Sequence, residues 1–247
     1  MGTNMADTEI SNEIETQHSP EKNGRNAKSL PKKLRLILID DHAVMRLGLG
    51  RLINDQPDME VCGEAANAND AMNLLEQVNP DLAIVDITLK QGTDGIELIK
   101  LFRNRKPEMP ILVLSMHDEA IYAERVLRGG AKGYITKQEA PENIMAAIRK
   151  VLAGEIYLSD KIASRMLNIA TGNRKNVEQS ALDRLSDREL QVFRFIAEGL
   201  SIRQIAAKLF LSVKTIETHR EHIKDKLNLE SSTQLLRYAV QYGINNV

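Results

Sequence analysis

The chain has 247 residues, of which 43% are hydrophobic and 27% charged, so it is not disordered throughout and its length suits one to two domains. The formal net charge is -1, so any nucleic-acid-binding surface must be local rather than a property of the whole chain. The single cysteine, Cys62, excludes a disulfide framework and a multi-cysteine zinc site.

Residues 1–33 are polar, carry scattered charges of both signs and have no hydrophobic period, so we expect a disordered tail. No stretch of the sequence approaches the ~18 apolar residues of a membrane-spanning helix. The N-terminus also lacks an apolar signal segment. Together with the single cysteine, these features predict a protein of the reducing cytoplasm that makes no membrane contact.

Residues 34–153 alternate short apolar runs with segments whose apolar residues have helical spacing. Short, wholly apolar runs fit strands that are buried on both faces. Strands that alternate with helices in this way indicate parallel βαβ units, and we therefore predict an α/β domain with a five-stranded, doubly wound parallel sheet. The predicted strands cover residues 34–40, 59–65, 82–87, 110–115 and 133–137.

Residues 154–182 read as a linker that contains one helix, DKIASRMLNIA, followed by a polar segment with a glycine. Residues 183–247 have no strand pattern. Ser186 and Ser201 each stand three residues before a Glu or Gln, the spacing of a capping box, and Ser212 is a third candidate N-cap. With a fourth helix over residues 233–242, the pattern predicts a small all-α domain of four helices that contains a helix-turn-helix.

Polar side chains follow four of the five predicted strands. They are Asp40 and Asp41, Asp86, Ser115 and Lys137. In a doubly wound sheet, ligands bind where the carboxyl ends of the strands meet. Three carboxylates repel one another unless a cation lies among them, and oxygen donors without a histidine cluster suggest Mg²⁺. Lys137 can balance the remaining charge or bind a phosphoryl oxygen.

A carboxylate beside a metal ion can attack phosphorus to give an aspartyl phosphate. Asp86 is the candidate nucleophile because it stands alone at the end of a central, wholly apolar strand. Each residue taken singly also has an ordinary interpretation. An Asp after a strand often caps the next helix, Ser115 could cap the helix that starts near His117, and a lone lysine is usually solvated. The coincidence of five suitable residues on four strand ends favours a site.

The segments LILIDDHAVMR, LAIVDI, VLSMHD and GYITK resemble the receiver domain of bacterial response regulators. The segment LSDRELQVFRFIAEGLSIRQIAAKLFLSVKTIETHREHIKDKL is similar to the LuxR-type helix-turn-helix. This pairing is that of NarL/FixJ-type two-component response regulators, and the resemblance covers residues 34–153 and 183–244. It implies a flavodoxin-like strand order, 2-1-3-4-5.

The resemblance also implies a function. A sensor histidine kinase phosphorylates Asp86, and the protein regulates transcription by binding specific double-stranded DNA as a homodimer; no turnover of a separate substrate is expected. The implied Mg²⁺ ligands are Asp40 (through water), Asp41, Asp86 and the backbone carbonyl of Thr88. The implied phosphoryl-binding and switch residues are Ser115, Lys137 and Tyr134, the last being an aromatic residue that changes rotamer on activation.

The loop after Asp86 departs from the family pattern. Lys90 stands where the family usually has proline, and the glycine that opens the next helix falls one residue late, at Gly95. Lys90 either tunes the lifetime of the phosphoryl group or the choice of kinase, or it is simply a solvated side chain.

Residues 213–227 form the predicted recognition helix, because the second helix of a helix-turn-helix enters the major groove. Residues 201–226 carry six basic and three acidic side chains, a local excess of +3 that suits phosphate contacts. Glu221 either reads a cytosine amino group or forms an ion pair with Lys224 one turn away. The predicted DNA contacts are Lys214, Thr215, Thr218, His219, Glu221 and Lys224.

Three other functions are weaker. An aspartyl-phosphate enzyme of the haloacid dehalogenase type places two aspartates two residues apart after one strand, whereas Asp40 and Asp41 are adjacent and Asp86 follows another strand. A receiver fold that no longer uses phosphate would not need the complete set of acids and Lys137. A protein-binding helical bundle remains an alternative for residues 183–247.

Overall fold

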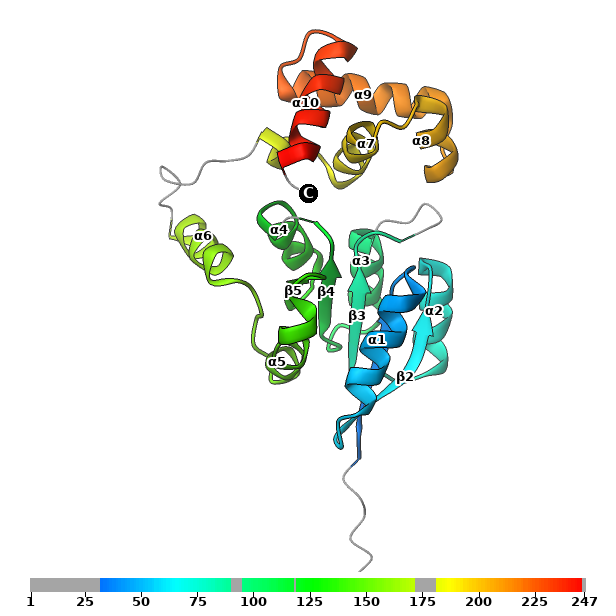
Figure 1. Ribbon diagram of the computed structural model, residues 1–247, viewed down its shortest axis with the longest axis vertical. Coiled ribbons are helices and arrows are strands. Elements are labelled where there is room, and N and C mark those ends of the chain that lie inside the picture. Colours follow the sequence, from blue (N-terminus) through cyan, green and yellow to red (C-terminus); the bar gives the residue numbers. More distant parts are fainter. Residues whose placement is uncertain (1–31, 90–94, 118, 172–180, 246–247) are drawn as a thin grey trace, which may run out of the picture. The chain divides into compact units, whose positions relative to one another are not determined.

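The structure, a computed structural model, describes residues 32–89, 95–117, 119–171 and 181–245. One parallel sheet of five strands lies at the centre of the first domain, in the order β2-β1-β3-β4-β5 (Figure 1). This confirms the predicted doubly wound fold, and the strand bounds lie within one residue of those predicted. The strands are β1 (Leu34–Ile39), β2 (Met59–Ala65), β3 (Leu82–Asp86), β4 (Ile111–Ser115) and β5 (Gly133–Thr136).

Helices cover both faces of the sheet, which explains why its central strands are apolar throughout. Successive side chains of a strand point to opposite faces. Leu36 and Leu38 of β1 pack in the cluster that contains the side chains of α1 and α5, whereas Ile37 and Ile39 pack in the cluster that contains those of α2, α3 and α4. These helices are α1 (Ala43–Asn54), α2 (Ala68–Gln77), α3 (Gly95–Arg105), α4 (Glu119–Gly129) and α5 (Ala140–Leu152).

The helix predicted between the two domains is present as α6 (Asp160–Ala170). Two hydrogen bonds hold α6 and the residue before it on the first turn of α4. The Ser159 N–H donates to the Glu119 carboxylate at 2.9 Å, and the Arg165 guanidinium donates to the Ala120 carbonyl at 3.0 Å. The predicted tail over residues 1–31 and the linker residues 172–180 lie outside the described residues. The exact domain boundaries stay predictions.

The C-terminal domain is entirely helical over its described residues, as predicted. All three predicted N-caps are confirmed, because Ser186, Ser201 and Ser212 each accept a hydrogen bond from the backbone N–H three residues later. Its core includes Phe193, Ile205, Ile216, Ile223 and Leu235, all buried to 1% exposure or less. The elements are the 3₁₀ turn η2 (Ala181–Arg184) and the helices α7 (Asp187–Ala197), α8 (Ile202–Leu209), α9 (Val213–Leu227) and α10 (Ser232–Asn245).

Among the described residues, no helix combines the length and the hydropathy that crossing a membrane requires.

Candidate functional site

Three carboxylates meet at the carboxyl end of the sheet. One oxygen each from Asp40, Asp41 and Asp86, together with a ring nitrogen of His42, lie within 4.8 Å of one another. The adjacent parallel pairing of β1 and β3 brings their ends together, so residues 46 positions apart share one site. Asp40 and Asp86 are only 3% and 1% exposed. The predicted acidic cluster is therefore confirmed as a juxtaposition of side chains.

Lys137 lies between two of these carboxylates. Its Nζ is 2.6 Å from Oδ2 of Asp40 and 2.8 Å from Oδ2 of Asp86, and its side chain is buried. Burial alone would lower the pKa of Lys137, but the carboxylates of Asp86 and Asp40 outweigh it and raise the pKa above its ordinary value. The lysine is therefore a fixed cation against the carboxylate of the candidate nucleophile.

The carboxyl group of Asp86 is held in place from two sides. Its Oδ1 accepts a hydrogen bond from the Thr88 N–H at 2.9 Å, and its Oδ2 contacts Lys137. Burial raises the pKa of Asp86 to about 6, and the Lys137 ammonium and the Thr88 N–H act in the opposite direction. Near neutral pH the carboxylate form predominates, which is the form able to attack phosphorus.

The aspartates at the strand ends do not cap the helices that follow. The N-cap of α1 is His42, whose side chain makes no capping hydrogen bond, while Oδ1 of Asp40 accepts the His42 N–H at 2.8 Å. Helix α3 begins only at Gly95, well after Asp86. The interpretation of Asp40 and Asp86 as ordinary helix caps is wrong, because Oδ1 of each accepts the N–H two residues later in its own loop and Oδ2 of each faces Lys137.

Two of the predicted switch residues, Ser115 and Tyr134, contact His117. The Ser115 hydroxyl oxygen accepts the His117 N–H at 3.0 Å, and the hydroxyl of the buried Tyr134 donates to the His117 carbonyl at 2.7 Å. On the other side, Oγ1 of Thr88 lies 2.8 Å from Nε2 of His117. The prediction considered His117 only as the start of a helix and so missed its contacts. Its position two residues after Ser115 was the available signal.

Gly95 allows α3 to start directly against the end of β3. A Cβ atom at this position would overlap the Asp86 carbonyl oxygen and the Ile87 Cα, so only glycine fits without a shift of the backbone. Its N–H donates to the Ile87 carbonyl at 3.0 Å. The late glycine noted in the sequence is thus part of the packing beneath Asp86. Lys90, the other departure from the family pattern, lies outside the described residues.

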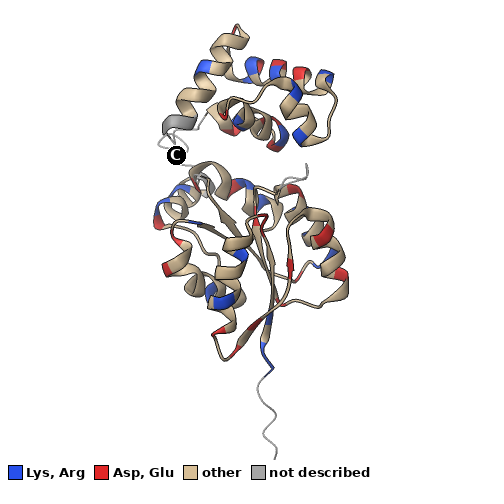
Figure 2. Ribbon diagram, turned by 45° about the vertical axis from the view of Figure 1, so that its right-hand side comes forward, with Lys and Arg blue, Asp and Glu red and all other residues tan. Residues whose placement is uncertain are grey.

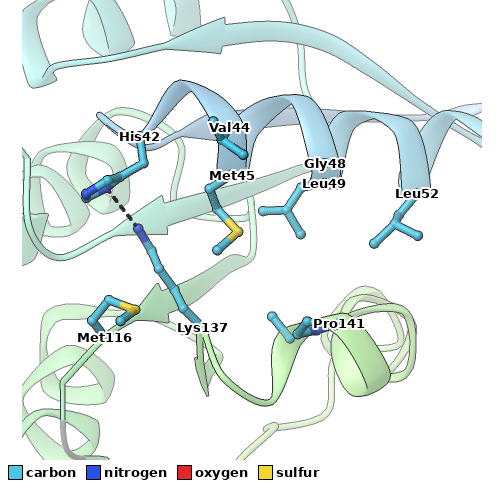
Figure 3. Close-up of a pocket in the computed structure, with 10 residues that line it drawn as sticks. His42, Val44, Met45, Gly48, Leu49, Leu52, Met116, Lys137 and Pro141 are labelled. Atoms are coloured by element: carbon cyan, nitrogen blue, oxygen red, sulfur yellow. Dashed lines mark hydrogen bonds between the residues drawn. The ribbon is translucent and has the colours of Figure 1, made fainter. Parts of the chain in front are cut away.

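An apolar groove opens beside the acidic cluster, between α1 and the start of α5. We call it the α1–α5 groove; its volume is about 420 Å³. His42 and Lys137 lie at one end, where their nitrogens are 3.4 Å apart (Figure 3). Val44 of the groove is 84% exposed, and Leu47 on the same helix is 70% exposed. The remaining lining residues are Met45, Gly48, Leu49, Leu52, Met116, Ala140 and Pro141.

Helix α9 carries the predicted DNA contacts and side chains of both charges (Figure 2). Lys214 and Thr218 are exposed, and the Thr218 hydroxyl donates to the Lys214 carbonyl at 3.1 Å. Nζ of Lys224 lies 2.6 Å from the Glu221 carboxylate, so the ion-pair alternative for Glu221 is present in the structure. Thr215 and His219 are half-buried.

Glu189, a buried acid, links α9 to α7. The sequence indicated only its role as the partner of Ser186 in a capping box. Oε2 of Glu189 accepts the Ser186 N–H at 2.7 Å and also lies 2.6 Å from Nζ of Lys226. Burial raises the pKa of Glu189, but the hydrogen bonds from Lys226 and Ser186 outweigh this effect and leave the pKa below its ordinary value. Lys226 is therefore engaged in holding the recognition helix to the domain.

Comparison with known proteins identifies the same two domains that the sequence predicted. Residues 36–149 match the response regulator receiver domain, and residues 183–239 match the luxR family of bacterial regulatory proteins. The oxygen regulatory protein NreC of Staphylococcus carnosus (strain TM300) is 38% identical over 211 residues, which cover 84% of this chain and 97% of NreC. NreC of Staphylococcus haemolyticus (strain JCSC1435) is 37% identical over the same shares of both chains.

Solved structures show the same architecture. RcsB from Salmonella enterica serovar Typhimurium, bound to promoter rprA in the presence of the phosphomimetic BeF3-, matches with a TM-score of 0.61 and 28% identity. The match covers 85% of this chain and 99% of RcsB. A LuxR-family two-component response regulator from Aurantimonas sp. SI85-9A1 matches 57% of this chain and 99% of its own, with 34% identity and a TM-score of 0.52. The chain belongs to the NarL/FixJ-type two-component response regulators, which join a receiver domain to a LuxR-type DNA-binding domain.

Proposed function

We propose that Asp86 is the phosphoacceptor of this response regulator and that a sensor histidine kinase supplies the phosphoryl group. The observation that carries the proposal is the position of its carboxylate, which is buried at the sheet edge, contacts Lys137 and shares a cluster with Asp40 and Asp41. Four groups with complementary roles in phosphoryl transfer converge there from three strand ends.

The bonds that change in the proposed phosphoryl transfer involve only Asp86 and the phosphorylated imidazole of the donor. A carboxylate oxygen of Asp86 forms a bond to phosphorus, the bond between phosphorus and the donor imidazole nitrogen breaks, and the released imidazole takes up a proton. The Lys137 ammonium, now 2.8 Å from Asp86, can instead pair with a phosphoryl oxygen. The Ser115 hydroxyl can turn from the His117 N–H toward the same group.

The acidic cluster fits a divalent cation with oxygen ligands. Three carboxylates face one ammonium, so the cluster keeps a surplus of negative charge that would repel a phosphodonor. The proposed Mg²⁺ ligands are Asp40, through water, Asp41, Asp86 and the Thr88 carbonyl. Bound Mg²⁺ would neutralise charge between the carboxylates and the phosphoryl oxygens.

The proposed output is regulated binding of a homodimer to specific double-stranded DNA in the cytoplasm. The chain stores the phosphoryl group and turns over no separate substrate. Support comes from the exposed face of α9 and from RcsB, which has been solved bound to promoter DNA and, in one structure, as two dimers on two DNAs. Lys214, Thr215, Thr218, His219, Glu221 and Lys224 are the proposed DNA contacts, with Glu221 and Lys224 acting as an ion pair.

Phosphorylation with a small phosphodonor tests the acceptor directly. Incubation with Mg²⁺ should add one phosphoryl group to the full-length protein, and removal of Mg²⁺ should block the transfer. The Asp86→Asn variant should not be labelled. Label that persists in Asp86→Asn would place the acceptor elsewhere, and labelling that is independent of Mg²⁺ would reject the proposed metal site.

A further inference from the structure

Helix α8 ends at a phenylalanine whose backbone is left-handed. Phe210 has φ 54° and ψ 39°. Its N–H donates to the Ala207 carbonyl at 3.3 Å, and the next N–H, of Leu211, donates to the Ala206 carbonyl at 2.9 Å. This pair of hydrogen bonds is the Schellman motif, which satisfies the last carbonyls of a helix and requires a left-handed residue at its centre.

The same motif ends five helices in the part of the chain that the structure describes, and Phe210 is the exception among them. A left-handed backbone brings Cβ close to the following carbonyl oxygen, so the position favours glycine and, next, asparagine. The central residues at the ends of α4, α5, α7 and α9 follow this preference. They are Gly130, Gly154, Gly199 and Asn228.

Phe210 does not offset its backbone strain by burial. The residue is 73% exposed, so most of the ring remains in contact with water. A phenylalanine that is both strained and solvated contributes less to folding than a glycine would at the same place. The free protein therefore gives no structural reason for this side chain, and a contact with a binding partner does.

The position of Phe210 in the helix-turn-helix indicates that this partner is DNA. It lies in the turn between α8 and α9, two residues before Ser212, the N-cap of the recognition helix α9. The neighbouring Val213 is also exposed, and Lys208 and Lys214 stand on either side in the sequence. Lys208 itself lies over the Phe195 ring, 4.5 Å from its centroid, so it does not cover Phe210. An exposed apolar ring just before the start of the helix that enters the major groove suits the wall of a DNA duplex.

We propose that Phe210 is a DNA-contacting residue whose ring packs on apolar groups of the duplex, either deoxyribose edges or thymine methyl groups at the border of the major groove. The proposal rests on the proposed DNA-binding function. The left-handed backbone fixes the direction of the Cα–Cβ bond, so only the two side-chain torsion angles of Phe210 are ordered when DNA binds.

The decisive test measures both the thermal stability and the DNA affinity of variants at Phe210. The probe is a duplex that the phosphorylated wild-type protein selects from a random-sequence pool. Phe210→Gly should raise the melting temperature by a few degrees and yet weaken binding at least about fivefold. Phe210→Tyr, which keeps the ring, should bind like the wild type. Asn228→Gly is the matched control at the other end of α9, because it alters the same motif and should leave affinity unchanged.

Two further measurements identify the contact. The slope of log affinity against log salt should be the same for Phe210→Gly and the wild type, since no charge is lost. A duplex with uracil in place of thymine lacks the methyl groups. If these are the partner, the wild type should lose more affinity on the uracil duplex than Phe210→Gly does; if deoxyribose is the partner, uracil should change the affinity of both proteins by the same factor.

Equal affinity of Phe210→Gly and the wild type would overturn this proposal while leaving DNA binding itself supported. Equal affinity with a loss of transcription regulation at a target promoter would likewise overturn it and assign the ring to a protein partner. A phosphorylated wild-type protein that selects no duplex at all would reject the proposed function instead, and this inference with it.

Discussion

The Thr88 side chain contacts the His117 ring, Oγ1 to Nε2, at 2.8 Å, and so joins the loop after β3 to the loop after β4. Burial lowers the pKa of His117 to about 3, so the ring is neutral at physiological pH and one of its nitrogens can accept a hydrogen bond. The carbonyl of the same residue accepts the Tyr134 hydroxyl. One histidine therefore ties together the phosphoacceptor loop, Ser115 and the switch aromatic.

Breaking this contact should shorten the life of the phosphoryl group. Thr88→Val and His117→Ala each free one loop beside Asp86, and we expect water to reach the aspartyl phosphate several times faster. Because both changes remove the same hydrogen bond, the double variant should decay about as fast as either single one. The measurement is loss of label after the phosphodonor is removed. Additive effects would show that the two residues act separately.

Gly95→Ala should damage the acceptor site through packing alone. The added methyl group would overlap the Asp86 carbonyl and the Ile87 Cα, and forcing extra volume into such a site costs about 1–3 kcal/mol. We expect a lower free energy of unfolding in urea and slower phosphorylation. Gly48→Ala is the matched control, because its new Cβ meets nothing within 4 Å and lies in the middle of α1. It should stabilise the protein by up to about 1 kcal/mol.

The α1–α5 groove leads to a prediction about how a kinase delivers its phosphoryl group to Asp86. A kinase must bring its phosphohistidine to Asp86, and the exposed apolar side chains of α1 stand beside that approach. Val44→Asp and Leu47→Asp should slow transfer from a phosphorylated kinase by about tenfold or more, as expected when an apolar contact is replaced by a buried charge. Labelling by a small phosphodonor should be unchanged. Equal slowing with both donors would mean that the variants damage the site itself.

Glu189→Gln should lower stability at pH 7 and change its dependence on pH. The folded-state pKa of Glu189 lies below the ordinary value of 4.5, so its contribution is present above that pH and is lost as the pH falls through the folded-state pKa. Loss of a charged hydrogen bond costs about 1.5–3 kcal/mol. Urea unfolding between pH 7 and pH 3 should show the two proteins converging at low pH. Glu198→Gln, an exposed acid after the same helix, should change little.

The sequence predicted most accurately those features that depend on a local residue pattern or on the topology of the sheet. Capping boxes at Ser186 and Ser201 were predicted because both partners lie within one turn. The acidic cluster was predicted because parallel strands place their carboxyl ends together. The Thr88–His117 contact spans 29 positions and the Glu189–Lys226 pair spans 37, so neither leaves a local signal. The left-handed backbone of Phe210 was missed because the usual signal is glycine.

The hydrogen bonds between α6 and α4 have a mechanical consequence. Glu119 and Ala120, the groups that hold the start of α6, belong to the first turn of α4, only a few residues beyond His117. The chain that leaves the receiver fold is thus tethered to the stretch of backbone that carries the Tyr134 contact. If phosphorylation displaces that stretch, the two hydrogen bonds would transmit the movement directly to the interdomain segment. The movement would not need to be transmitted through β5 or α5.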